Sequence, residues 1–148
     1  MTNETYHGQD FYTVIHGLRH HYVRWGDPGK DPVILLHGLM NNGRYWEHIA
    51  RALEADYCVY APDLRGHGES DHAPGGYLVW AFAMDLRGFV EEMDFEGFDL
   101  VAHSIGSRVA TIVSATELEL DSLGRDDILR FNSGDWVESL SALVEDDT

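Results

Sequence analysis

The stretch LVAHSIGS (residues 100–107) decides how this chain is interpreted. An apolar, strand-like run ends at His103 and Ser104, and apolar residues at helical spacing follow at once. A small residue two positions before a serine, and a glycine two positions after it, form the pattern of a nucleophile elbow. Ser104 is therefore a candidate nucleophile. The simpler alternative is that Ser104 only caps the helix, as serine often does.

The residues around Ser104 meet the requirements of such an elbow. The positions two residues before and after the serine must be small, because the backbones of strand and helix nearly touch there. Gly106 satisfies this requirement, and Ala102 departs from glycine by a single methyl group. The helix start places partial positive charge beside Ser104, and the amide of Ile105 is an expected donor to a developing oxyanion. This context favours the elbow over the cap.

The rest of the chain alternates between strand-like and helix-like segments. Strands are expected at residues 11–16, 18–26, 33–38, 57–62 and 98–103, and apolar helical stripes within residues 46–53, 86–93 and 109–116. This alternation predicts an α/β fold: a mostly parallel, twisted sheet with flanking helices on both faces. A hairpin is expected at Gly17. The order weakens after Thr116, where a short strand at residues 117–123 and a helix at residues 136–144 are expected.

Composition limits the classes of partner. The chain has 148 residues, enough for one domain, and a formal net charge of −16, half of it in residues 116–148. Nucleic acid and anionic membranes both require clustered Lys and Arg, so neither is an expected partner. The chain shows no apolar run of membrane-spanning length and no secretory signal at its N-terminus, and we therefore expect a cytoplasmic location. The lone cysteine, Cys58, is interpreted as a buried strand residue.

Two further polar loops follow predicted strands, at the edge of a parallel sheet where ligands gather. In residues 37–43, Gly38 permits a sharp turn that leaves amide N–H groups for an oxyanion, although an ordinary turn explains the same residue. In residues 63–72, Asp63 and Arg65 are expected to pair and brace the loop.

Three ordered motifs make the chain similar to the α/β-hydrolase family. They are VILLHGLMNNGRYWEHIARAL, YCVYAPDLRGHGESD and DLRGFVEEMDFEGFDLVAHSIGSRVA. The resemblance covers about residues 11–115 and leaves residues 116–148 as a divergent acidic segment of one partial domain. A serine at the elbow points away from the family's epoxide hydrolases and haloalkane dehalogenases, which carry aspartate there. It points toward acyl chemistry on esters, lactones or similar substrates.

The resemblance also implies roles for individual residues. Ser104 would be the nucleophile, and the backbone amides of Leu39 and Ile105 would form the oxyanion hole. Trp46 and His103 would lie near the pocket.

The chain departs from the family in its histidines. The family's order is Ser, then Asp or Glu, then His, whereas no histidine follows His103 here. Serine is a poor nucleophile without an adjacent base. His37, beside the proposed oxyanion loop, is the better upstream candidate for a base near the pocket, because His103 is expected to point away from Ser104. The resemblance thus implies an N-terminal half or a shortened form, with the strand at residues 98–103 open to self-association.

Three functions are consistent with these residues. The first is a serine hydrolase that binds a small-molecule substrate, forms an acyl-enzyme at Ser104 and needs no cofactor. The second is a non-catalytic, hydrolase-derived domain that binds a ligand or a partner chain. The third is a metal enzyme, although no spacing among the candidate histidines matches a known ligand motif. Those candidates are His20, His21, His67 and His72.

Overall fold

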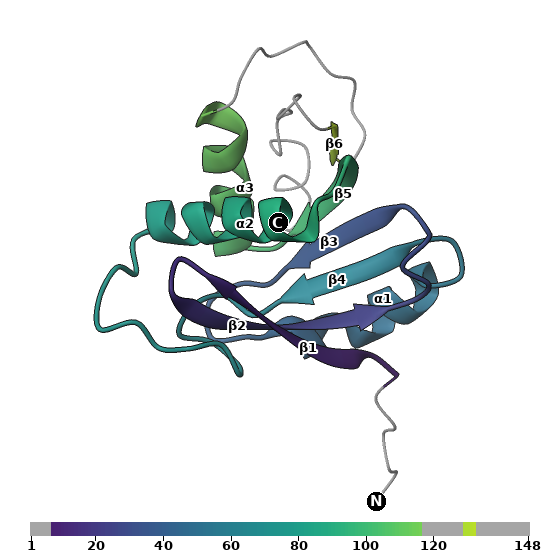
Figure 1. The fold of residues 1–148 in the computed structure, drawn as a ribbon, viewed down its shortest axis with the longest axis horizontal. Helices are drawn as coiled ribbons and strands as arrows, with labels where there is room; N and C mark the ends of the chain where they lie inside the picture. The colour runs from purple at the N-terminus through teal and green to yellow at the C-terminus, as the bar shows by residue number, and fades with distance from the viewer. Residues whose placement is uncertain (1–6, 117–128, 133–148) are drawn as a thin grey trace, which may run out of the picture.

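A single mixed sheet runs through the computed structural model, which describes residues 7–116 and 129–132 (Figure 1). Its strands are β1 (Gln9–Ile15), β2 (Leu18–Trp25), β3 (Pro32–Leu36), β4 (Cys58–Pro62), β5 (Gly97–Ala102) and β6 (Leu129–Asn132), in the spatial order β1-β2-β4-β3-β5-β6. β3 pairs in parallel with β4 and β5, while the outer pairs are antiparallel. The α/β fold expected from the sequence is confirmed, with its parallel part in the middle of the sheet.

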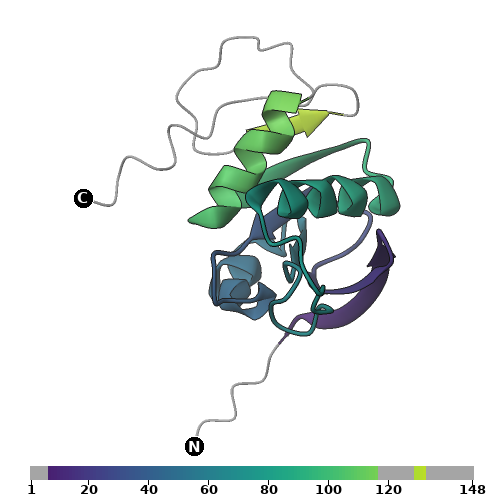
Figure 2. The ribbon, with the colours of Figure 1, turned by 90° about the vertical axis from the view of Figure 1, so that its left-hand side faces the viewer.

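Helices cover both faces of this sheet (Figures 1 and 2). The 3-10 turn η1 (Gly43–Trp46) and helix α1 (Glu47–Leu53) lie on one face. Helices α2 (Val79–Met93) and α3 (Ile105–Thr116) lie on the other. Within the described part of the chain, none of these helices has the length and apolar character needed to cross a membrane.

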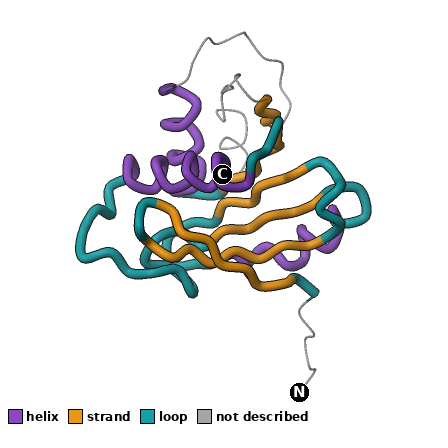
Figure 3. The backbone as a smooth tube through the Cα atoms, viewed as in Figure 1, coloured by secondary structure: helices purple, strands orange, loops and turns teal. Residues whose placement is uncertain are grey.

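Strand β3 shows why helices are needed on both sides. Val33 and Leu35 pack into the cluster under α1, whereas Ile34 and Leu36 pack into the cluster under α2 and α3. All four side chains are at most 4% exposed. Successive side chains of a strand point to opposite faces, so a continuous apolar run requires cover on each. Figure 3 shows the strands side by side, with α2 and α3 above them and α1 behind them.

The hairpin at one edge of the sheet was predicted from the sequence, whereas the strand at the other edge was not. The hairpin forms as expected, with His16 and Gly17 at φ 50° and 79° in a two-residue turn between β1 and β2. At the opposite side, β6 pairs antiparallel with β5, with Leu129 opposite Leu100, although the sequence assigned no strand there. The strand expected at residues 117–123 and the helix at residues 136–144 lie outside the described residues.

The loop after β4 is braced by a different ion pair from the one expected. Arg65 donates two hydrogen bonds to Asp85 of α2, from Nε to Oδ2 at 2.6 Å and from Nη2 to Oδ1 at 2.7 Å. Asp85 is buried. The expected pairing of Asp63 with Arg65 is wrong, because the long guanidinium side chain reaches across to α2 while Asp63 binds His21.

Replacing Asp85 tests how much the buried Arg65–Asp85 pair contributes to the free energy of unfolding. Asp85→Ala leaves the Arg65 guanidinium largely buried without its carboxylate, so the free energy of unfolding should fall by about 3–5 kcal/mol in urea denaturation. The exposed Arg87–Glu91 pair supplies the control. Glu91→Ala should cost at most about 0.5 kcal/mol. Equal effects of the two substitutions would contradict the assigned role of Arg65 and Asp85.

Helix α3 approaches β3 so closely that a side chain has no room between them. A Cβ atom built on Gly106 would lie 2.7 Å from the Leu36 carbonyl oxygen and 3.0 Å from that of His37. Both contacts are with backbone, which cannot rotate away as a side chain would. The glycine of the elbow pattern is therefore required by the contact between α3 and the strand beside β5.

A matched pair of glycine substitutions tests this close approach. Gly106→Ala should lower the free energy of unfolding by about 1–3 kcal/mol, because the new methyl group overlaps the β3 backbone. Gly75→Ala introduces a methyl group with no neighbour within 4 Å. It should change stability by less than about 1 kcal/mol, in the stabilising direction if at all. Urea denaturation of both variants measures the two effects. An unchanged free energy of unfolding in Gly106→Ala would refute the packing described.

Candidate active site

Ser104 stands at the turn between β5 and α3 in a backbone conformation that serine rarely adopts. Its φ is 57°, in the left-handed region, and its side chain is exposed. A helix N-cap normally has extended φ and ψ and accepts the N–H of the residue three positions on with its side chain. Here the Ser107 N–H donates to the main-chain carbonyl oxygen of Ser104 at 3.0 Å. The geometry is that of a strained turn and differs from an ordinary cap.

The loop after β3 lies directly against this turn at Gly38. A Cβ atom on Gly38 would lie 3.0 Å from Ser104 Cβ and 3.2 Å from His103 Nδ1. The His103 N–H donates to the Leu36 carbonyl oxygen at 3.1 Å, which ties the elbow to the end of β3. Since Leu39 follows Gly38 in the chain, the predicted oxyanion loop runs beside Ser104. Ser104 Cβ and His103 Nδ1 thus both lie close to Gly38.

The second predicted oxyanion donor, Ile105, is the first residue of α3. The N–H groups in the first turn of a helix have no partner four residues earlier, and they carry the positive end of the helix dipole. The amides of Ile105 and Leu39 thus belong to segments that meet at Ser104, one from each side of the elbow.

His37 is fully buried and works as a tie between two loops. The Leu64 N–H donates to its Nε2 at 3.0 Å, so the ring proton lies on Nδ1 and is donated to the Gly38 carbonyl oxygen at 2.7 Å. Burial lowers the pKa of His37, consistent with a neutral ring. Because both ring nitrogens are engaged, His37 is not free to take a proton from Ser104. Its sequence-based candidacy as an upstream base finds no support in this geometry.

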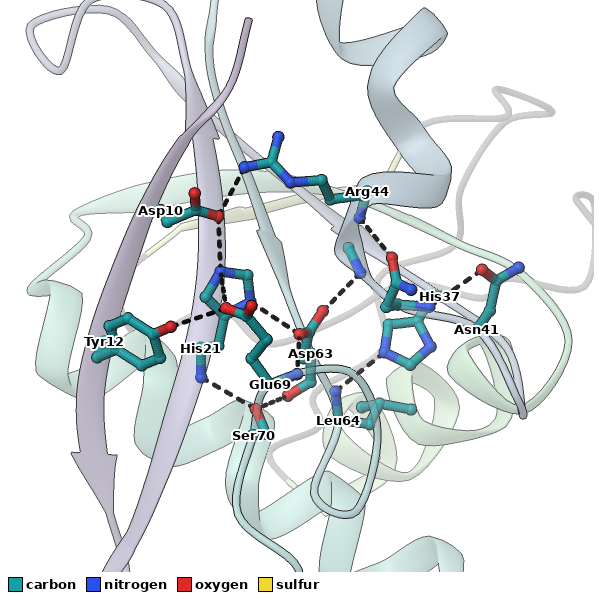
Figure 4. A network of polar contacts seen from close by, with 12 residues as sticks. Asp10, Tyr12, His21, His37, Asn41, Arg44, Asp63, Leu64, Glu69 and Ser70 are labelled. Atoms are coloured by element: carbon teal, nitrogen blue, oxygen red, sulfur yellow. Dashed lines mark hydrogen bonds and ion pairs between the residues drawn. The ribbon is translucent and has the colours of Figure 1, made fainter. Parts of the chain in front are cut away.

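A buried carboxylate, Asp63, collects donors from three different segments (Figure 4). Its Oδ1 accepts the Gly43 N–H at 2.6 Å. Its Oδ2 accepts the Glu69 N–H at 2.9 Å and lies 2.7 Å from His21 Nδ1. Asp63 is only 2% exposed. Burial would raise the pKa of Asp63, but the His21 ring and the two N–H donors hold it below its usual value. Asp63 therefore stays ionised and anchors the end of the oxyanion loop.

His21 completes this network from strand β2. Its Nε2 lies 2.9 Å from Asp10 Oδ1, and its Nδ1 faces Asp63. Burial would lower the pKa of His21, but the hydrogen bonds to Asp63 and Asp10 raise it above the usual value. Asp10 is held in turn by Arg44 at 2.6 Å. This network was not predicted from the sequence, although two adjacent histidines in an alternating strand were a visible signal.

Trp46, which the resemblance placed near the pocket, is a buried residue. It is 5% exposed and packs in the core cluster under α1 with Trp25. Its neighbour Tyr45 faces the elbow instead, with its ring stacked near that of His103 at a centroid distance of 6.1 Å. The short 3-10 turn η1 thus directs Trp46 into the core and Tyr45 toward the elbow.

Three of the histidines of the metal alternative have separate partners. His20 faces Asp85, His21 faces Asp63 and Asp10, and the His67 ring is tilted against that of His37. A different set, Asp10, His21 and Glu69, places possible ligand atoms within 4.8 Å of one another. These atoms already bind protein partners, among them the Arg44 guanidinium, whose positive charge at Asp10 disfavours a cation there.

Known proteins resemble this chain over most of its length. Residues 31–123 match the family model described as alpha/beta hydrolase fold. "Epoxide hydrolase 4" of Mus musculus is 34% identical over 107 residues, which cover 70% of this chain and 30% of that protein. "Probable serine hydrolase" of Drosophila melanogaster is 32% identical over 101 residues, covering 64% and 30%.

The fold comparison agrees. The "Thioesterase Domain From Curacin Biosynthetic Pathway" superposes with a TM-score of 0.71 at 29% identity, covering 74% of this chain and 42% of that one. The chain spans about a third of the length of the curated relatives it matches. Its elbow, its mixed sheet and the family match over residues 31–123 lead to one conclusion: the chain belongs to the alpha/beta hydrolase fold family.

Proposed function

We propose that this chain carries the nucleophile and oxyanion hole of a serine hydrolase that acts on an ester, a lactone or a similar acyl substrate. The observation that carries the proposal is Ser104 itself, exposed at φ 57° between β5 and α3. Residues with a strained backbone of this kind are concentrated at functional sites, where the strain is part of the mechanism. Gly38 supports it by bringing the loop of Leu39 against the serine.

The proposed reaction is acyl transfer through Ser104, with the proton acceptor outside the residues identified above. The Ser104 hydroxyl oxygen attacks the substrate carbonyl carbon and passes its proton to a base. The carbonyl oxygen becomes an oxyanion and accepts hydrogen bonds from the amides of Leu39 and Ile105. Collapse of the tetrahedral intermediate expels the alcohol and leaves an acyl-serine ester. Water then attacks this ester, which releases the acid and regenerates Ser104.

The residue type at the elbow separates acyl substrates from epoxides, although epoxide hydrolases are among the relatives. A carboxylate that opens an epoxide forms an ester, which water can hydrolyse. A serine that opened an epoxide would form an ether, which water does not cleave under the same conditions. With Ser104 as nucleophile, turnover therefore requires a carbonyl substrate.

The catalytic base of the family is a histidine that follows the nucleophile in the sequence, and this sequence has no such histidine. No histidine follows His103, and both ring nitrogens of His37 are engaged. We therefore expect Ser104 to react slowly and chiefly with strongly activated electrophiles. Sites that keep the oxyanion hole but lose a member of the triad still retain about 10³–10⁴-fold acceleration over water.

Labelling with a fluorophosphonate tests the proposal. The probe forms a covalent phosphonyl ester with an activated serine, so the intact mass of the folded chain should increase by one adduct over hours. Ser104→Ala should abolish the adduct, and peptide mapping should place it on Ser104 in the parent chain.

Two controls make the labelling result decisive. Urea-unfolded protein keeps the serine hydroxyl but loses the elbow and the oxyanion hole, so it should not be labelled. No adduct on the folded chain, or the same adduct on the Ser104→Ala variant, would overturn the proposed activity.

A second function is favoured by the engaged ring of His37. If no base reaches Ser104, the chain is a hydrolase-derived domain that binds a small ligand or a partner without chemistry. This alternative expects no phosphonate adduct and ligand binding that Ser104→Ala leaves unchanged. A tenfold loss of binding in that variant would count against it.

A further inference from the structure

The network around His21 has a consequence for the oxyanion loop. His21 presents both ring nitrogens to carboxylate oxygens, with Nδ1 2.7 Å from Asp63 and Nε2 2.9 Å from Asp10. An ionised carboxylate can only accept hydrogen bonds, so both nitrogens must carry protons to satisfy this arrangement. The geometry therefore assigns an imidazolium to His21, although its side chain is only 3% exposed.

The charge on His21 is transmitted to the loop through Asp63. Asp63 binds His21 with Oδ2 and the Gly43 N–H with Oδ1, so one carboxylate joins strand β2 to the end of the loop of residues 38–43. Gly43 packs so closely against the Ala61 carbonyl oxygen that a Cβ atom would not fit between them. The opposite end of the loop is fixed by His37 through the Gly38 carbonyl oxygen.

We propose that His21 is a positioning residue whose imidazolium, acting through Asp63, holds the oxyanion loop in place, and that loss of its proton loosens this loop. A neutral imidazole carries one ring proton, so one of the two carboxylates then loses its donor. Whichever ring nitrogen loses its proton, the charge of the buried Asp63 is left without its cationic partner, which is costly. The purpose of the loop rests on the proposed function, but the anchoring itself is independent of any reaction.

The groups that face His21 set the direction of the pH effect. Asp63 follows β4, Asp10 and Tyr12 come from β1, and Glu69 comes from the loop after β4, with its Oε2 3.4 Å from Nε2. Arg44 of η1 is the opposing positive charge, bound to Asp10. Three carboxylates thus favour the protonated ring. Since the folded-state pKa of His21 is raised, its contribution is complete below about pH 6.5 and is lost as the pH rises through the raised value.

Nuclear magnetic resonance of the full chain tests the proposal without substrate. The Gly43 amide proton and the His21 ring should shift together with one midpoint above about pH 6.5. Asp10→Asn removes one carboxylate and leaves the loop residues unaltered, so it should lower that midpoint by about 0.5–1 pH unit. The matched control Glu92→Gln makes the same charge change on the exposed surface of α2 and should leave the midpoint unchanged.

Amide exchange gives a second readout. In His21→Gln the imidazolium is absent at every pH, so protection of the Gly43 amide, which Asp63 accepts, should fall about tenfold at pH 6. The proposal would be overturned if the chemical shift of the Gly43 amide did not change as His21 titrates, or if the midpoint in Asp10→Asn were unaltered. Both outcomes can be measured even if His21→Gln fails to fold. Absence of phosphonate labelling in the parent chain would contradict the proposed function instead, so the two failures are distinguishable.

Discussion

The closeness of helix α3 to strand β3 is the constraint on which the rest of the site depends. Gly106 packs against the Leu36 carbonyl oxygen, and Gly38 packs against the Cβ of Ser104. With the helix pressed onto the neighbouring strand, the chain has only two residues in which to turn from β5 into α3. The turn therefore places Ser104 at positive φ, exposed at the carboxyl edge of the parallel strands.

Buried polar groups hold the loops that surround Ser104. His37 joins the start of the oxyanion loop to Leu64, and Asp63 joins its end to His21. These contacts use backbone N–H groups as partners, so they fix the course of the main chain. An oxyanion hole made of backbone amides needs this kind of support, because its donors cannot be adjusted by changing a side-chain rotamer.

Much of this could be predicted from the sequence, because each feature is local. The elbow, the alternation of strands and helices and the hairpin at Gly17 depend on residues within a few positions of one another. What the sequence did not predict depends on contacts across the sheet. Asp63 was assigned to Arg65 because they are two residues apart, whereas its partner His21 is 42 residues away. Strand β6 and the inward turn of Trp46 were missed for the same reason.

The central claim is that residue 104 stands where the protein stabilises negative charge, and a thiol placed there reports it directly. In Ser104→Cys, the only other cysteine is Cys58, which is fully buried. The rate of alkylation by iodoacetamide, followed against pH, gives the pKa of the new thiol. The helix start and the oxyanion amides should lower that pKa below the value of about 8.5 for free cysteine. A thiol pKa at or above that value would contradict the assignment of the elbow.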